Sequence, residues 1–418
     1  MNNSDIFCFL NKAQNKENIS LSKFCNEDIT ANVMNFHKSL PSYKSTPLIS
    51  LSALAKRLGI DKLFIKDESK RFDLNAFKVL GASYAIAKVL GNKLNLCDEE
   101  LVFEKIINQK DKFKDITFVT ATDGNHGRAV AWAAQKFGSK AVVYMPKGSS
   151  PTRLEAIKKY GAQASITEGN YDDTVDYAKK MSQKNGWILL QDTAWNGYEE
   201  VPIHIMQGYI SLVSEYLEDE KEIWPTHVFV QAGVGSLAAA VLASLYSYAN
   251  KKLPIFIVVE PFGAPCLYNS LKLNSGKSYK VEGDLKTIMA GLACGESSSL
   301  ALEVLKSRVF IENFITEHQL LVPLMAAKNW NDVSNELIID DSIYDLTSKK
   351  WLREVEAPKN PKPSPWESFK EFSDILSIST DEETGLVTLS IEYYSPELGI
   401  NWLALLVNDI NATMQSKD

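Results

Sequence analysis

The sequence predicts an α/β fold with two parallel-sheet subdomains, followed by an α+β module at the C-terminal end. From Ile116 onward, short apolar runs alternate with amphipathic stretches of helical length, which is typical of parallel strands joined by right-handed crossovers. A second alternating block runs from Tyr198 to about Gly283. Beyond about Leu300 the pattern changes, and an alternating hairpin and a final amphipathic helix replace the strand–helix repeats.

The first part of the chain leads up to one lysine. Residues 1–40 are polar and predict short helices, and Pro47–Leu58 predicts an extended segment that continues into an amphipathic helix. A strand is predicted over Leu63–Lys66, and beyond Lys78 the apolar spacing becomes helical. Lys78 therefore lies at the mouth of a strand–loop–helix junction.

The block after Ile116 predicts a parallel sheet of its own. Its elements are expected in the order strand Thr117–Thr120, helix Asn125–Phe137, strand Ala141–Met145, helix Pro151–Tyr160, strand Gln163–Thr167 and helix Tyr171–Asn185. In the second block, the run Ile255–Glu260 is almost wholly apolar, as expected for a strand that is covered on both faces. Two such sheets would place a ligand in the cleft between them, at the carboxyl ends of the strands.

Composition limits the classes of function. A net charge of −7 argues against a general binder of nucleic acid or anionic membranes. The N-terminus has no basic residues ahead of an apolar run, and the longest weakly polar run, Ala232–Ala249, contains serines and tyrosines, so neither a signal peptide nor a membrane span is expected. Five widely spaced cysteines predict no metal site and no disulfide framework, and they fit a reducing, cytoplasmic setting.

Lys78 is a candidate nucleophile because of its surroundings in the sequence. Phe77 and Val79 flank it, and desolvation by such neighbours lowers the pKa of a lysine and frees its amine to attack a carbonyl. The alternative is an ordinary surface lysine in the first turn of a helix.

Three later segments favour the chemical interpretation. Ala121–Trp132 follows a strand and opens a helix with small and polar residues, among them Asp123 and Asn125. Gln231–Ala238 also follows a strand, and its glycines and helix N-terminus suit a phosphate. Leu189–Trp195 places Asp192 just after a short apolar run. Both aspartates could instead be ordinary helix caps or turn residues.

Together these segments resemble the fold-type II pyridoxal-phosphate enzymes, the tryptophan synthase β-like superfamily, and within it the diaminopropionate ammonia-lyases. The resemblance covers about the first 300 residues. It is carried by Ser45–Leu48, Asp67–Ser69, Arg71–Phe72, Asn75–Lys78, Thr122–Gly127, Asp192–Trp195, Gly233–Ser236 and Thr287–Glu296.

The resemblance implies a cofactor, a substrate and site residues. The cofactor is pyridoxal 5'-phosphate (PLP), the substrate is a small amino acid, 2,3-diaminopropionate, and the products of β-elimination are pyruvate and ammonia. Lys78 would be the Schiff-base lysine, with Asn125 beside the phenolic oxygen of the cofactor, and Asp123 and Asp192 would be paired acid/base carboxylates on opposite faces. The phosphate would be held by Gly233, Val234, Gly235 and Ser236. A homodimer is also expected.

Two other functions are considered. A serine or threonine dehydratase of the same fold is the first, although these enzymes usually carry serine where Asp123 stands. The second is a non-enzymatic fusion related to polysaccharide chain-length control. Residues 301–418 resemble the periplasmic region of the polysaccharide chain-length determinant family, through Leu305–Arg308, Leu376–Ser379, Thr384–Ile391, Tyr394–Pro396 and Trp402–Asn411.

The expected domains are therefore residues 1–300, with a smaller subdomain inserted at about 90–200, and residues 301–418. The final segment of the lyase family, including the stretch that approaches the pyridine nitrogen, is missing. We expect a fusion in which the larger subdomain is loosened, retains its cofactor weakly and has little or no lyase activity. The lyase family also has a cysteine at the positions of Cys266 and Cys294; these could pair, but free thiols are favoured.

Overall fold

The computed structural model describes residues 24–122, 124–219, 223–248, 254–272, 278–283, 285–305, 314–315, 318–355, 360–363, 365–380 and 387–415. The described residues up to 305 form one compact unit, and those from 314 onward form a second. Each unit is described by itself.

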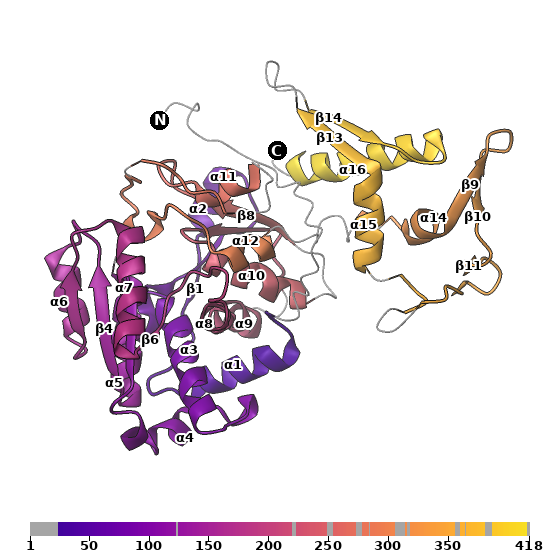
Figure 1. Cartoon of the computed structure of the whole chain (residues 1–418). Helices are drawn as coiled ribbons and strands as arrows, with labels where there is room; N and C mark the ends of the chain where they lie inside the picture. Colours follow the sequence, from indigo (N-terminus) through magenta and orange to yellow (C-terminus); the bar gives the residue numbers. More distant parts are fainter. Residues whose placement is uncertain are drawn as a thin grey trace. The chain divides into compact units, whose positions relative to one another are not determined.

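A four-stranded, fully parallel sheet organises the first half of the larger unit (Figure 1), with strand order β5-β4-β3-β6. Val119 and Ala121 of β3 pack with Ala178 of α7, whereas Val143 of β4 lies against Gly127 of α5. Helices therefore cover both faces, as a parallel sheet requires. The elements are β3 (Thr117–Ala121), β4 (Lys140–Met145), β5 (Gln163–Ile166), β6 (Ile188–Leu189), α5 (Asn125–Phe137), α6 (Pro151–Lys158) and α7 (Tyr171–Asn185).

The segment before Lys78 contains two short strands. β1 (Leu48–Ser50) and β2 (Phe64–Lys66) pair antiparallel and are connected by α2 (Ser52–Leu58). After the 3-10 helix η2 (Glu68–Asp73), helix α3 (Lys78–Lys93) packs against α5 and α8 (Glu200–Gly208). The approach of α3 to α8 is close, because a Cβ atom at Gly208 would lie 2.5 Å from the Leu80 carbonyl oxygen.

Further helices lie in this part of the larger unit. They are α1 (Glu27–Ser39), η3 (Asp98–Glu100), α4 (Phe103–Ile107), η4 (Lys110–Lys112) and α9 (Ser211–Asp219). Within the described part of the chain, no helix is both long and apolar enough to span a membrane.

A second parallel pair, β7 (His227–Gln231) and β8 (Ile255–Val259), follows, with α10 (Ser236–Ser247), α11 (Cys266–Lys272), η5 (Ala290–Leu292) and α12 (Ser299–Leu305). Both parallel sheets were predicted. The apolar run at 255–260 alone indicates a strand that is covered on both faces, whereas the expected loosening of the larger subdomain indicates less cover, and β8 is only partly covered. The residues of β8 are only half-buried or exposed, and Phe229 of β7 is 68% exposed. Helix α10 packs on β7, and apolar side chains such as Phe229 and Val259 are exposed.

The second unit is an α+β module, as predicted. Three antiparallel hairpins join β9 (Ala327–Asn331) to β10 (Glu336–Ile339), β11 (Tyr344–Asp345) to β12 (Lys350–Trp351), and β13 (Leu376–Thr380) to β14 (Val387–Ile391). Its helices are α14 (Leu321–Ala326), α15 (Pro365–Ile375) and α16 (Pro396–Gln415). The described core consists of Phe314, Ile315, Leu320, Leu324, Phe372, Leu376, Trp402 and Leu406.

Candidate active site

The site is centred on a lysine and an aspartate from different elements. Lys78 is the first residue of α3, and Asp192 follows the end of β6. The Nζ atom of Lys78 lies 2.5 Å from Oδ2 of Asp192, and the carboxylate is buried. A lysine in an ion pair with a buried carboxylate is not an ordinary surface lysine.

The charge of Asp192 is fixed by its neighbours. Burial alone would raise the pKa of its carboxyl group, but the Lys78 ammonium, His126 and the hydrogen bond from Lys78 outweigh burial and lower the pKa to about 2. His126 Nδ1 lies 3.8 Å from Oδ2 of Asp192, while its Nε2 lies 2.9 Å from the Leu190 carbonyl oxygen. Asp192 is therefore ionised at neutral pH.

A glycine loop between β7 and α10 adjoins this pair. Gly235 has a φ of +95°, which glycine adopts without strain. A Cβ atom at Gly233 would lie 2.9 Å from Cys294 Sγ, so a side chain does not fit there. The Ser236 hydroxyl donates a 2.8 Å hydrogen bond to the Asp192 carbonyl oxygen. The loop and the lysine–aspartate pair are thus directly connected.

These residues fit PLP. The 12-residue helix α10 begins at Ser236, so its first-turn N–H groups and the preceding glycines form a cradle suited to a phosphate. The Lys78 amine, held beside the same loop through Asp192 and Ser236, supplies the group that reacts with an aldehyde.

Two further candidate residues are Asn125 and Asp123. Asn125 is the first residue of α5 and is exposed, and the next residue, His126, approaches Asp192. Asp123 lies outside the described residues. The structure therefore brings together Lys78, Asp192 and Ser236, and it brings helix α5 beside them.

Cys266 and Cys294 carry reduced thiols, as favoured from the sequence. The Cys266 thiol donates a 3.3 Å hydrogen bond to the Gly233 carbonyl oxygen, and burial raises its pKa. Both cysteines therefore contact the glycine loop as packing residues.

Two buried side chains that the sequence did not reveal support the site. The Gln191 amide lies between the strand ends: its Oε1 accepts a 3.0 Å hydrogen bond from the Ala121 N–H, and its Nε2 donates to the Ala121 carbonyl oxygen. The Ser298 hydroxyl accepts from the Ala194 N–H, and the Ser298 N–H donates to the Val234 carbonyl oxygen. In the sequence, the only sign that either residue supports the site is the position of Gln191 next to Asp192.

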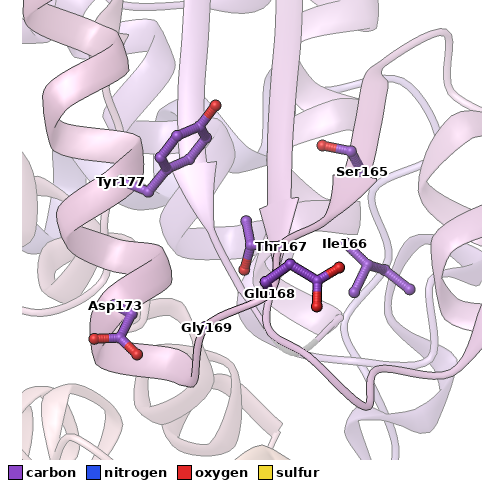
Figure 2. A pocket seen from close by; sticks show the side chains of 7 residues that line it. All are labelled: Ser165, Ile166, Thr167, Glu168, Gly169, Asp173 and Tyr177. Atoms are coloured by element: carbon purple, nitrogen blue, oxygen red, sulfur yellow. The ribbon is translucent and has the colours of Figure 1, made fainter.

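A separate hollow of about 420 Å³ lies at the end of β5 beside α7 (Figure 2). None of the candidate site residues lines it. Its lining consists of Ser165, Ile166, Thr167, Glu168, Gly169, Asp173 and Tyr177.

Comparisons with known proteins agree with this geometry. Residues 40–316 match the family model of the pyridoxal-phosphate dependent enzymes. Diaminopropionate ammonia-lyase from Salmonella typhimurium is 51% identical over 287 residues, which cover 67% of this chain and 71% of the relative. A catabolic L-threonine dehydratase from Staphylococcus aureus is 29% identical over 209 residues, or 50% of this chain and 51% of the relative.

A solved structure extends the comparison to three dimensions. Diaminopropionate ammonia-lyase from Escherichia coli, in complex with an aminoacrylate-PLP azomethine reaction intermediate, matches with a TM-score of 0.63 and 44% identity over 71% of this chain and 73% of that one. The family-model match, residues 40–316, includes the lysine, the aspartate and the glycine loop. The chain therefore belongs to the pyridoxal-phosphate dependent enzymes and, within them, to the diaminopropionate ammonia-lyase family.

Proposed function

We propose that this protein is a PLP-dependent ammonia-lyase that converts 2,3-diaminopropionate to pyruvate and ammonia. The observation that carries the proposal is the contact between Lys78 and the buried Asp192 beside the glycine loop. Half of the aligned residues are shared with a diaminopropionate ammonia-lyase, which favours this substrate over serine or threonine.

Each part of the site has a role in binding. The loop Gly233, Val234, Gly235 and Ser236 would hold the phosphate, and the Lys78 amine would be the covalent attachment point. Asn125, at the start of α5, would be the partner of the phenolic oxygen. When bound, PLP withdraws electrons from the α-carbon of an amino acid and so makes its proton acidic.

Asp192 holds and moves a proton. The Lys78 ammonium is a main cause of the low pKa of this carboxyl group. Once the Lys78 amine carries no charge, that stabilisation ends, and burial raises the basicity of Oδ2. A carboxylate also pairs with the second, cationic amine of the substrate, which a serine or threonine substrate lacks. Asp123 is the second carboxylate of this proposal and takes the place where a dehydratase carries serine.

The decisive experiment combines a spectrum with a product assay. Purified protein supplied with PLP should absorb near ~410–420 nm, where a lysine-linked cofactor absorbs, and should release pyruvate from 2,3-diaminopropionate. Faster release of pyruvate from serine, or of 2-oxobutyrate from threonine, would instead identify a dehydratase. If the protein with added PLP shows no absorbance near ~410–420 nm, the non-enzymatic alternative is favoured.

Assembly and setting complete the proposal. We infer a homodimer in the cytoplasm, and sedimentation velocity with and without PLP tests the dimer. For the C-terminal module we infer a relationship to the polysaccharide chain-length determinants, supported by the hairpin β13–β14 and the long helix α16. A solved structure of such a protein that superposes on this module with the same hairpin-to-helix order would support that relationship, and a different order would refute it.

A further inference from the structure

A buried ion-pair network lies at the start of the turn that leads to Lys78. Arg71, in η2, is fully buried, and so is the side chain of Glu215 in α9. The Arg71 guanidinium donates from Nη1 to Oε1 of Glu215 at 2.6 Å and from Nη2 to Oε2 at 2.8 Å. This two-point geometry fixes the orientation of the arginine as well as its position.

The network balances its charges. Lys66 Nζ lies 2.9 Å from Oε2 of Glu215, and Glu68 accepts from Nε and Nη2 of Arg71, both at 2.8 Å. Tyr43 donates its hydroxyl to Glu215 at 2.7 Å. A buried pair of this kind adds little stability compared with apolar residues of similar size, although removal of one partner is costly. Its presence is better explained by geometry than by stability.

The turn after Arg71 is strained. Phe72, Asp73 and Asn75 have φ values of 48°, 57° and 55°, in the left-handed region that residues other than glycine rarely adopt. Such residues persist only where the surroundings hold them. Arg128 of α5 donates to the Leu74 carbonyl oxygen, so the middle of the turn is also held.

Helix α9 holds the chain on the far side of Lys78 as well. His37 lies 2.6 Å through Nδ1 from the Ser211 hydroxyl of α9 and 3.0 Å through Nε2 from the Leu80 carbonyl oxygen. Burial lowers the pKa of His37 to about 3, so this link is uncharged at neutral pH. Contacts with helix α9 therefore fix the chain on both sides of Lys78, directly at Arg71 and through His37 at Leu80.

We propose that Glu215 is a positioning residue for the lyase reaction: through Arg71 it fixes the strained turn that presents Lys78 Nζ to Asp192. This inference rests on the proposed function, because it assigns Lys78 as the attachment point. Glu215 touches neither substrate nor cofactor, and its effect reaches the reaction only through the turn.

The test compares three variants of the full-length protein. Glu215→Gln removes the charge that holds Arg71. Arg71→Gln combined with Glu215→Gln removes the pair and leaves one positive and one negative charge of the network, those of the partly buried Lys66 and Glu68. Glu218→Gln is the matched control, since Glu218 lies on the same helix and pairs with exposed Lys38. Three quantities are measured: urea unfolding, amide hydrogen exchange of residues 67–80 without cofactor, and the rate at which borohydride traps PLP on Lys78.

We expect Glu215→Gln to speed exchange in the turn and to slow trapping, each at least about tenfold. The double variant should recover the urea midpoint of the wild type but not its trapping rate, and Glu218→Gln should match the wild type in all three. If Glu215→Gln does not fold, the trapping rate of the double variant tests the inference alone.

Two results would overturn the inference. One is unchanged trapping in Glu215→Gln, and the other is a double variant whose trapping rate recovers together with its stability, since Glu215 would then be only structural. A wild type that binds no PLP on Lys78 would refute the proposed function and, with it, the role of Glu215 in the reaction; faster exchange of the turn in the variants would then show only that Glu215 stabilises the turn.

Discussion

The Nζ atom of Lys78 lies 2.5 Å from Oδ2 of Asp192, although the two residues are 114 positions apart in the chain. Lys78 starts a helix of the layer that packs on α5 and α8, whereas Asp192 follows the edge strand β6 of the four-stranded sheet. The contact therefore depends on the packing of that layer against the sheet, and the following predictions depend on it.

Replacing Lys78 with alanine should abolish covalent attachment of PLP, because among the residues that the structure describes Lys78 is the lysine that pairs with Asp192 beside the glycine loop. Borohydride reduction followed by peptide mapping should label Lys78 in the wild type. Lys88→Ala is a suitable control, since Lys88 lies on the same helix and pairs with Asp98. A label on any other lysine of the wild type would end the assignment.

Asp192→Asn should lower kcat for 2,3-diaminopropionate by about 10²- to 10⁴-fold, the usual contribution of a positioned acid or base. The amide keeps the size of the side chain but cannot accept the proton. Asp176→Asn removes an exposed carboxylate from α7 and should leave kcat unchanged. Equal rates in the two variants would remove Asp192 from the reaction.

Asp123→Ser gives this chain the residue that dehydratases usually carry. We expect turnover of 2,3-diaminopropionate to fall at least about tenfold, equivalent to about 1.4 kcal/mol of transition-state stabilisation. The loss should be larger for the diamino acid than for serine, which has no second cationic amine. Steady-state kinetics with both substrates measures this, and an unchanged rate would show that the carboxylate takes no part.

Glu260 predicts a pH dependence of stability. Burial raises the pKa of its carboxyl group from 4.5 to about 7, although the N–H groups of Leu267 and Tyr268 donate to it and act in the opposite direction. The folded state then binds the proton more tightly than the unfolded state. The stabilisation is complete below pH 4.5 and is lost as the pH rises to about 7, by on the order of 2 kcal/mol.

Urea titrations at several pH values measure this effect. Between pH 5 and pH 8 the unfolding free energy of Glu260→Gln should fall less than that of the wild type. Glu282→Gln, which removes an exposed carboxylate, should follow the wild type. Parallel curves for all three proteins would contradict the prediction.

The partly uncovered β7–β8 pair predicts weak cofactor retention. Phe229, Val259 and Phe262 are 68%, 47% and 78% exposed, and apolar surface left in water forgoes roughly 25 cal/mol per Å², so a few hundred Å² amount to several kcal/mol. A chimera that carries a lyase C-terminal segment after residue 305 should melt at a higher temperature with PLP and should be more active. Equal melting temperatures and equal activity would show that the missing segment does not matter.

The sequence by itself determined the local elements of this protein. The helices 125–137 and 171–185 lie where they were predicted, because their apolar spacing, caps and terminal glycines act over a few residues. The candidate residues were also visible, since Lys78, Asp192 and the glycine loop each lie at a strand end or a helix start.

Only the tertiary structure decided which of these residues meet. No local pattern pairs Lys78 with Asp192, or Arg71 with Glu215, since each contact is set by the packing of whole elements. The apolar run of β8 did not by itself reveal the exposure of this strand, because such a run records a preference for burial but not whether another segment covers it; the exposure was expected only from the unusual C-terminal part of the chain. Long-range packing decides burial, and burial decides the charges on which the chemistry of this site depends.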